Sequence, residues 1–384
     1  MPLIKKLHHA SVSDVHVFHP ETPTKHILAN LTKAFPDSEV TGDLDAIFIV
    51  GDFFDQIAVL PDPNVSLVKA WIVRFLKMCA RRHITIFVLE GTPKHDRGQN
   101  KLFTELVELA EIPVQLHYIT QLEIFHWSEF GVDILFVPDE WSSGQWASST
   151  IETQREVKAL MAQRGLEKVD FAFVHGAMDY HLKVVKKHLV HDPNFYRSIT
   201  RYQTWMGHIH TPDNRDRILM NGSFDRLNHG EEHPKGHWRC VTQPNGDYTA
   251  TFMENKGAAI YKTIWLKNPD VDISMTEVRE GIEGLPKGAH VRIRADRGHP
   301  VIAGLETLRR EYPHIHFKPK TDTEEEEKAL DQAMVDDELN LGIEITPNNV
   351  VGLVDIKLDA MGIDPALKKA CLDALCEDIY GQRP

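Results

Sequence analysis

Aspartate and histidine residues follow short apolar runs at five places along the chain. Each run has four to six residues and is rich in β-branched or aromatic side chains, which is typical of a buried strand. The segments that follow the runs are Ser13-Asp14-Val15-His16, Gly51-Asp52-Phe53-Phe54-Asp55, Gly91-Thr92-Pro93-Lys94-His95-Asp96, His175-Gly176 and Gly207-His208-Ile209-His210. Because ligands of open α/β sheets gather at the carboxyl ends of strands, we expect these side chains to meet at one edge.

Imidazole and carboxylate groups together suit a pair of divalent cations. Two such ions about 3.5–4 Å apart can hold the attacking and leaving oxygens of a phosphoryl transfer. We expect Asp52 to bridge the ions, because it follows a glycine that permits close approach. The first site would be completed by Asp14, His16 and His210, and the second by His175 and His208. His208 and His210 can face different metals only if the backbone turns between them. A ligand set of both nitrogen and oxygen atoms favours Mn²⁺, and Fe²⁺, Zn²⁺ and Mg²⁺ remain open as alternatives.

Other residues of these loops are candidates for catalysis or phosphate binding. His95 is left as an imidazole without a metal, placed to stabilise or protonate a leaving group. The candidate residues for catalysis are His95, Asp55 and Asp96, and those for contacts with phosphate are Lys94, Arg97 and Arg226. His229, His233 and His237 recur at four-residue spacing, but the glycines and proline between them favour a solvent-facing loop.

The elements that must position these residues alternate between strand and helix. Strands are expected at 46–50, 84–89, 133–137, 171–174 and 217–221. Apolar stripes predict helices at 64–82 and at 148–165, and the second helix begins with a capping box from Ser149 to Glu152. Alternation of this kind predicts an α/β domain.

The composition of the sequence and the pattern of its predicted elements change twice along the chain. Residues 1–257 form the α/β domain, and 258–320 read as a smaller α+β unit with strands at 259–268 and 290–296 and a helix at 303–312. Residues 321–384 begin with a run of glutamates and continue with two apolar-striped helices, at 348–362 and 365–380. These helices either dock on a partner or fold back on the smaller unit.

The distribution of charge permits a nucleic-acid partner. The formal charge of the 384 residues is −13, but residues 321–384 hold 16 acidic and 5 basic residues, a net of −11 that leaves −2 for the rest. A near-neutral body can carry basic patches, and the candidates are Arg81 with Arg82, Lys183–Lys187, and Arg215 with Arg217 and Arg226. Solvated faces remain the alternative for each patch.

Several classes of protein are disfavoured by the sequence. No apolar run approaches the length of about 18 residues expected of a membrane span, and the N-terminus lacks the features of a secretion signal. The four cysteines form no CxxC motif, which favours free thiols in a reducing cytoplasm. We therefore expect a cytoplasmic protein without a membrane partner.

Taken together, Asp-x-His, Gly-Asp-x-x-Asp, Gly…His-Asp, His-Gly and Gly-His-x-His resemble the motifs of calcineurin-like metallophosphoesterases. Residues 221–238, NGSFDRLNHGEEHPKGHW, are similar to the Gly-Ser…Arg…Gly-Glu…Lys-Gly segment of SbcD-type nuclease subunits of DNA double-strand-break repair. The resemblance covers residues 4–257 well and 258–320 loosely.

The resemblance implies a β-sandwich flanked by helices, a DNA-contacting capping domain at 258–320 and a partner-binding helical tail at 321–384. It also implies a Mn²⁺-dependent exonuclease and endonuclease that acts on double-stranded DNA ends and single strands, as a homodimer. The partner implied for the tail is an SMC-like coiled-coil ATPase, and this chain has no Gly-x-x-x-x-Gly-Lys-Ser/Thr loop of its own. A bacteriophage source would place the protein in the host cytoplasm.

One motif departs from the family. The family box reads Gly-Asn-His-Asp, with the asparagine on the second metal, whereas this chain reads Gly91-Thr92-Pro93-Lys94-His95-Asp96. The ammonium of Lys94 cannot ligate a cation, although it could contact a DNA phosphate. We expect the second metal to rest on Asp52, His175, His208, water and Thr92, and to bind more weakly than the first; two equally tight metals would contradict this.

Two other functions remain open on the sequence alone. The same site would serve a phosphodiesterase or phosphatase acting on small nucleotides or phosphoproteins, although such enzymes have no need of the unit at 258–320 or the tail. An architectural subunit that binds DNA ends with little catalysis is the other alternative, against which the retained His95 argues.

Overall fold

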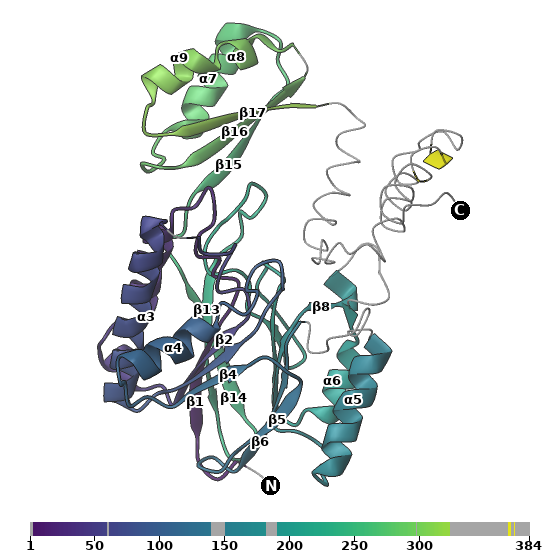
Figure 1. The fold of residues 1–384 in the computed structure, drawn as a ribbon. Helices are drawn as coiled ribbons and strands as arrows, with labels where there is room; N and C mark the ends of the chain where they lie inside the picture. The colour runs from purple at the N-terminus through teal and green to yellow at the C-terminus, as the bar shows by residue number, and fades with distance from the viewer. Residues whose placement is uncertain are drawn as a thin grey trace. The chain divides into compact units, whose positions relative to one another are not determined.

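Two six-stranded sheets form the body of the chain in this computed structural model (Figure 1). The structure describes residues 3–59, 61–139, 150–181, 190–296, 298–322, 368, 369 and 372. The first sheet has the order β14-β13-β1-β2-β3-β4, with bounds β1 Leu7–Val12, β2 Ala46–Val50, β3 Thr85–Leu89, β4 Leu116–Ile119, β13 Gly236–Thr242 and β14 Tyr248–Glu254. The second has the order β11-β12-β10-β7-β6-β5, with bounds β5 Glu123–Trp127, β6 Val132–Val137, β7 Phe171–His175, β10 Thr204–Gly207, β11 Asp213–Arg215 and β12 Ile218–Met220.

The two sheets share one core. Phe48 of β2 stacks on Phe173 of β7 with ring centroids 3.8 Å apart, and Phe87 and Phe136 extend the same stack. The next residues along β2, Ile47 and Ile49, face the other way, as the two-residue period of a strand requires.

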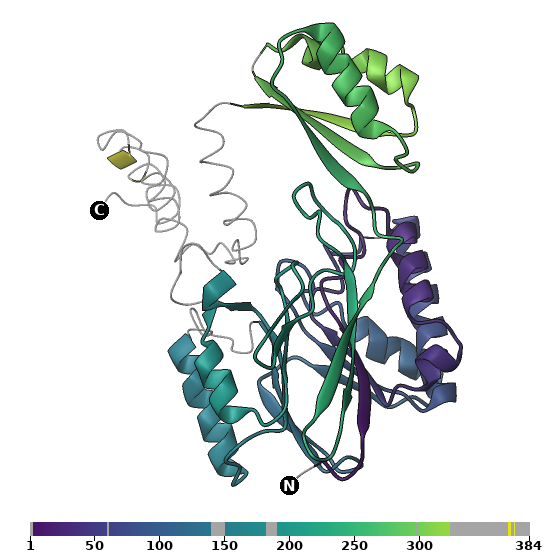
Figure 2. The ribbon, with the colours of Figure 1, turned by 180° about the vertical axis from the view of Figure 1, so that it is seen from behind.

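Helices cover the outer face of each sheet, and they lie on opposite sides of the body (Figures 1 and 2). The helices on the first sheet are α1 Thr24–Ala34, α3 Pro63–Arg82 and α4 Lys101–Leu109, and the short α2 covers Glu39–Gly42. Those on the second are α5 Thr150–Gln163 and α6 Pro193–Ile199. The two-stranded sheet of β8 Ala177–Met178 and β9 Val190–His191 and the 3-10 turn η1 Asp179–His181 complete this part. The predicted α/β class is confirmed.

Helix α3 shows how local sequence fixes an element. Asp62 caps its first turn by accepting the N–H of Asn64, and Pro63 occupies the first helical position, where no N–H is needed. The last helical residue is Arg82, followed by the cap residue His83 with φ 56°, and the helix buries Val68 and Ile72 against the sheet. The predicted helix at 64–82 is therefore confirmed.

Residues 258–322 build a separate three-stranded sheet with its own core. Its strands β15 Tyr261–Leu266, β16 His290–Asp296 and β17 His316–Asp322 are all parallel. The helices α7 Val271–Ile282, α8 Pro300–Ala303 and α9 Leu305–Glu311 lie on one face of this sheet (Figure 2). The predicted α+β class of this unit is wrong: parallel strands joined by helices make it a pair of βαβ crossovers.

Several predictions fall outside the described residues. They concern Ser149 of the capping box, the Lys183–Lys187 patch, the acidic segment and the tail helices, of which the structure describes Lys368, Lys369 and Leu372 as helical. Within the described ranges, no helix has both the length and the apolar content to cross a bilayer. Cys79 and Cys240 are free thiols, and both are buried.

The predicted solvent-facing loop at 229–237 is wrong at both ends. His237 belongs to β13 and packs on Phe35, and His229 packs on Tyr261, with both side chains buried. Both positions are buried because β13 pairs antiparallel with β1. Strand β1 lies more than two hundred residues earlier, so no local pattern in the sequence predicts this pairing.

His9 of β1 is fully buried among the rings of the shared core. Its ring meets Phe48 and Trp205 edge-on, and neither ring nitrogen has a hydrogen-bond partner among the described residues. Burial lowers the pKa of His9 to about 3, so the folded protein holds this imidazole neutral.

We expect His9 to make the fold sensitive to acid. Below pH 6.5 His9 is protonated in the unfolded chain but stays neutral in the folded chain. The free energy of unfolding therefore falls as the pH drops from 6.5 towards 3. Between pH 7 and 5 this group alone should cost about 2 kcal/mol. Urea unfolding at both pH values should show that His9→Phe loses about 2 kcal/mol less than wild type; equal losses would contradict the assignment.

Candidate metal centre

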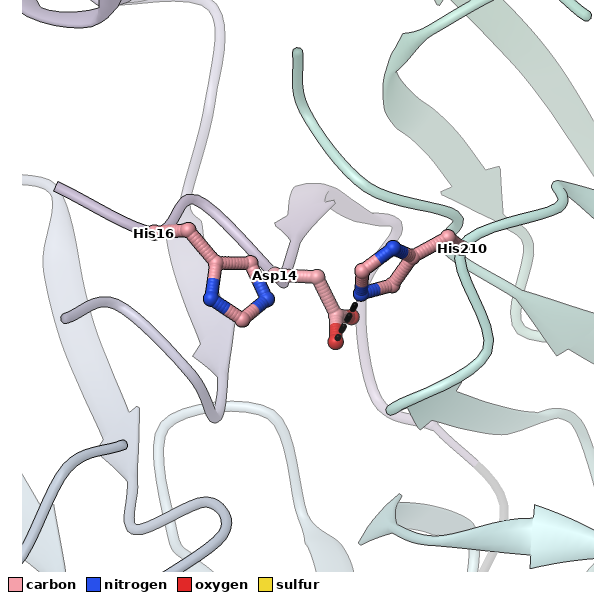
Figure 3. A group of neighbouring side chains, drawn as sticks. All are labelled: Asp14, His16 and His210. Carbon is pink, nitrogen blue, oxygen red and sulfur yellow. Dashed lines mark ion pairs between the residues drawn. The ribbon is translucent and has the colours of Figure 1, made fainter. Parts of the chain in front are cut away.

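The carboxyl ends of strands from both sheets bring six of the predicted residues together in two groups. Within each group, one ligand atom from every residue lies within 4.8 Å of the others. The first group is Asp14, His16 and His210 (Figure 3), and the second is Asp52, His175 and His208. The structure thus divides the residues as predicted, whereas the bridging of both groups by Asp52 remains a prediction.

The backbone is held in the left-handed region at four of these six residues. The φ angles are 50° at Asp14, 53° at His16, 50° at Asp52 and 89° at His208. Such conformations cost about 1–3 kcal/mol each in non-glycine residues and are concentrated at functional sites. The turn at His208 is the one that the prediction required, because it directs His208 and His210 into different groups.

Gly51 allows the second group to close. Its φ is 79°, and a Cβ atom there would lie 2.1 Å from Nδ1 of His175. A side chain at position 51 would therefore displace a ligand ring as well as strain the backbone. The close approach of His175 to position 51 explains why a glycine precedes Asp52.

Each histidine of the first group is held from its far side by a carboxylate. Nδ1 of His210 lies 2.8 Å from Oε1 of Glu231, and Nδ1 of His16 lies 3.2 Å from Oδ1 of Asp55. The Nε2 atom of each ring is then left for a cation, in the carboxylate–histidine–metal arrangement. Figure 3 shows the Asp14 carboxylate between the two rings, with Oδ1 3.8 Å from Nε2 of His210.

The second group is fixed by the backbone and by Thr92. Nδ1 of His175 donates to the carbonyl of Val50 at 2.8 Å, which leaves Nε2 to face Oδ2 of Asp52 at 3.3 Å. Asp52 accepts the N–H of Thr92 at 2.6 Å and its hydroxyl at 3.0 Å. The same hydroxyl lies 3.3 Å from Nε2 of His175, so Thr92 contacts this group from the place where the family motif has asparagine.

These residues fit divalent cations. Burial opposes a charge on His210, but the Glu231 and Asp14 carboxylates overcome it and raise the pKa to about 9. Burial likewise opposes a charge on His175, and Asp52 overcomes it and raises the pKa. Nε2 of His16 is buried without a hydrogen-bond partner among the described residues. These residues stabilise positive charge and leave nitrogen and oxygen atoms free to ligate. Such surroundings suit a metal ion but do not identify the metal.

The pair of Glu231 and Lys235 was missed as part of the site. Lys235 is fully buried, and its Nζ lies 2.9 Å from Oε2 of Glu231, 2.7 Å from Oγ of Ser223 and 3.0 Å from the carbonyl of His210. The Gly-Glu…Lys-Gly pattern of residues 230–236 was the available signal, but it does not show that the two side chains lie against His210. Lys235 holds the carboxylate that in turn holds His210, so both are positioning residues.

Replacing Glu231 by glutamine should weaken the first metal site. The loss of a carboxylate behind a ligating histidine typically costs about 10–100-fold in metal affinity. We expect calorimetric titration with Mn²⁺ to show this loss in Glu231→Gln but not in Glu232→Gln, an exposed neighbour. Circular dichroism should verify that both variants are folded, and a wild-type affinity in folded Glu231→Gln would refute the role of the carboxylate.

His95 lies beside the first group but is anchored to the backbone. Its Nδ1 donates to the carbonyl of Asp55 at 2.7 Å, and its ring meets that of His16 edge-on with centroids 4.7 Å apart. Burial lowers the pKa of His95 and outweighs the opposite effect of Asp52. The ring is therefore neutral at pH 7 and presents Nε2. With His16 and Asp55 it forms a third group whose ligand atoms lie within 4.8 Å.

Asp55 and Asp96, both predicted to be catalytic, lie where they position other residues. Asp55 holds His16 and His95, as described above. Asp96 is fully buried and accepts the N–H groups of Asp52 and Gly91 at 2.9 Å each. It also accepts the N–H of Phe54 at 3.1 Å and the side-chain amide of Asn100 at 2.7 Å, so it ties the loops after β2 and β3 together.

The three predicted phosphate contacts differ in their surroundings. Lys94 and Arg97 are exposed on the same loop as His95. The guanidinium of Arg226 is half-buried and donates to the carbonyls of Glu231 at 3.1 Å and Ala259 at 3.2 Å. Arg226 thus secures the segment that carries Glu231, and its contact with phosphate remains a prediction.

Comparisons with known proteins add little to this geometry. No family model matches the chain, and no curated protein does. A solved structure described as the crystal structure of TT1561 of Thermus thermophilus is 12% identical, covers 64% of this chain and 98% of that chain, and has a TM-score of 0.37. A second crystal structure is 11% identical, covers 66% and 99%, and also has a TM-score of 0.37. Likenesses this weak do not bear on the activity of the chain.

Proposed function

We propose that the chain is a metal-dependent DNA nuclease of the calcineurin-like metallophosphoesterase type, and specifically an SbcD-type subunit that processes DNA ends. The observation that carries the proposal is the pair of adjacent Asp/His groups with the neutral His95 beside one of them. When bound, two divalent ions would supply Lewis-acid activation of a phosphodiester and of water.

The residues of the chain have separable tasks in this proposal. Asp14, Asp52, His16, His175, His208 and His210 would hold the cations. Asp55, Asp96, Glu231 and Lys235 position residues of this set. Nε2 of the neutral His95 ring carries a lone pair, so the ring would first take up a proton there before donating it near the reacting phosphate, and Lys94 and Arg97 offer positive charge on the same loop. DNA as the substrate, Mn²⁺ as the metal, a homodimer and a separate SMC-like ATPase follow from the family resemblance alone.

Degradation of end-labelled linear duplex DNA tests the proposal. Wild type should degrade it with Mn²⁺ and not with a chelator, Asp52→Ala should be inactive, and His95→Ala should be slower by about 10²–10⁴-fold. Binding of DNA without cleavage by wild type would indicate an architectural subunit. Hydrolysis confined to small phosphodiesters or phosphoproteins would indicate the other enzyme class, and either result would refute the nuclease.

A further inference from the structure

His19 lies on the loop that carries Asp14 and His16, but it belongs to none of the groups of candidate ligands found among the described residues. Its N–H donates to the carbonyl of His16 at 3.1 Å, so the two histidines are joined by a tight turn. Within this turn Phe18 has φ 72°. Because the loop is fixed in this way, the hydrogen bonds of the His19 ring decide what the ring can offer to the site.

The hydrogen bonds of His19 assign its tautomer. Nδ1 accepts the N–H of Glu21 at 3.2 Å and the N–H of Thr22 at 3.0 Å. A ring nitrogen that accepts from two donors carries a lone pair and no proton, so the proton of the ring must be on Nε2. The geometry therefore makes His19 a neutral imidazole with a hydrogen-bond donor at Nε2.

The donor of His19 is free and lies close to the first group of candidate ligands. Both hydrogen bonds of the ring within the described part of the chain are made by Nδ1, which leaves Nε2 without an acceptor there. The ring is partly exposed. Burial lowers the pKa of His19, and among the charged groups the largest effect on this pKa is that of Asp55, ahead of His16. This order places the ring beside the carboxylate that holds His16.

His19 and His95 offer opposite groups to this site. Nδ1 of His95 donates to the carbonyl of Asp55, so Nε2 of that ring carries a lone pair, whereas Nε2 of His19 carries a proton. A lone pair can accept a proton from a reacting group, and a fixed N–H can stabilise negative charge on an oxygen. The non-bridging oxygens of a phosphodiester are anionic and only accept hydrogen bonds, so they match the donor of His19.

We propose that Nε2–H of His19 donates a hydrogen bond to an anionic oxygen of the phosphodiester, which makes His19 a second catalytic histidine beside His95. The bond transfers no proton and stabilises the charge on the phosphate oxygens in the transition state. The inference rests on the proposed function for the reaction, a metal-dependent hydrolysis of a phosphodiester, but not for DNA as the substrate.

Two substitutions separate the donor from the turn that His19 stabilises. His19→Asn keeps an oxygen near the position of Nδ1 that can accept the N–H groups of Glu21 and Thr22, but it has no group at the position of Nε2. His19→Gln carries an amide N–H near the position of Nε2 instead. His314→Asn, which changes an exposed histidine of the unit at 258–322, is the matched control.

Steady-state cleavage of linear duplex DNA with Mn²⁺ tests the role of the donor. His19→Asn should lower kcat about 10²–10³-fold with little change in KM, because the hydrogen bond acts mainly in the transition state. His19→Gln should recover part of this loss, and His314→Asn should behave as wild type does. A wild-type kcat in His19→Asn would overturn the proposal.

The tautomer can be tested without turnover. Proton–nitrogen NMR correlation spectra of the imidazole rings in EDTA should contain a signal that His19→Asn lacks, with the proton on Nε2. A proton on Nδ1 would overturn the proposal.

Bis(p-nitrophenyl) phosphate separates this inference from the proposed function. Because the donor acts on the phosphate and not on the leaving oxygen, His19→Asn should lose as much activity on this activated diester as on DNA. If wild type hydrolyses the diester but not DNA, and His19→Asn still lowers that rate, the nuclease is contradicted and the role of His19 stands. Wild-type turnover of the diester by His19→Asn would contradict the role of His19 alone.

Discussion

Replacing Asp52 by alanine should abolish Mn²⁺-dependent cleavage of DNA and lower metal affinity at the second group more than about 100-fold. Removing a residue that only orients a ligand lowers metal affinity about 10–100-fold, so removing a ligand itself should lower it further. Asp52 is buried, and its carboxylate lies 3.3 Å from Nε2 of His175. No other carboxylate belongs to this group among the described residues, so the loss leaves two histidines that bind a cation weakly.

The control for Asp52 must separate metal binding from folding. Asp52→Asn keeps the shape of the side chain and an oxygen that can accept the N–H of Thr92, so it should fold and still lose activity. Asp170→Asn alters another buried carboxylate, which pairs with Arg201 away from the metal groups, and should retain activity despite any loss of stability. Wild-type titration with Mn²⁺ in Asp52→Asn would show that Asp52 is not a ligand.

The candidate site could be predicted from the sequence largely because each candidate ligand lies at the end of a strand or within a few residues of it. A run such as AIFIV at 46–50 identifies β2 without knowledge of its neighbours, and the residues after it must lie at the carboxyl edge. β1, β2, β3, β7 and β10 all deliver their ends to that edge. The division into two groups does not follow from order along the chain, because it depends on the turn that separates His208 from His210.

What could not be predicted depends on contacts between distant segments. Glu231 and Lys235 belong to a stretch without regular periodicity, and their role exists only because His210 lies against them. The burial of His237 depends on the pairing of β13 with β1. The left-handed φ angles at Asp14 and Asp52 are uncommon in residues other than glycine, although aspartate tolerates them better than most, and no local pattern in the sequence predicts them.

The class of the unit at 258–322 was mistaken for a related reason. The strands 259–268 and 290–296 were predicted, but β17 and the helix α7 were not, and without them the unit appears to mix strands and helices irregularly. The sequence HFKPK of β17 reads poorly as a strand, because it carries a proline and two lysines. Its place at the edge of the sheet, where a missing N–H is tolerated, explains why proline occurs there.

Replacing His95 by alanine should lower kcat by about 10²–10⁴-fold while leaving Mn²⁺ affinity unchanged. The ring is tied through Nδ1 to the carbonyl of Asp55, and neither of the two principal ligand groups includes it. Calorimetric titration with Mn²⁺ and steady-state cleavage of DNA should be measured on the same preparation. His126→Ala, which removes a half-exposed ring on the edge strand β5, is the matched control and should keep both properties.

The choice of substrate can resolve what His95 does. If its imidazole assists departure of the leaving oxygen, an activated leaving group needs less help, so His95→Ala should lose far less activity on a p-nitrophenyl nucleotide ester than on DNA. An equal loss on both substrates would instead assign the ring a role before the leaving oxygen departs, such as accepting a proton at Nε2. A fall in Mn²⁺ affinity would place a cation in the third group, with His16 and Asp55, and make His95 a ligand rather than a catalytic residue.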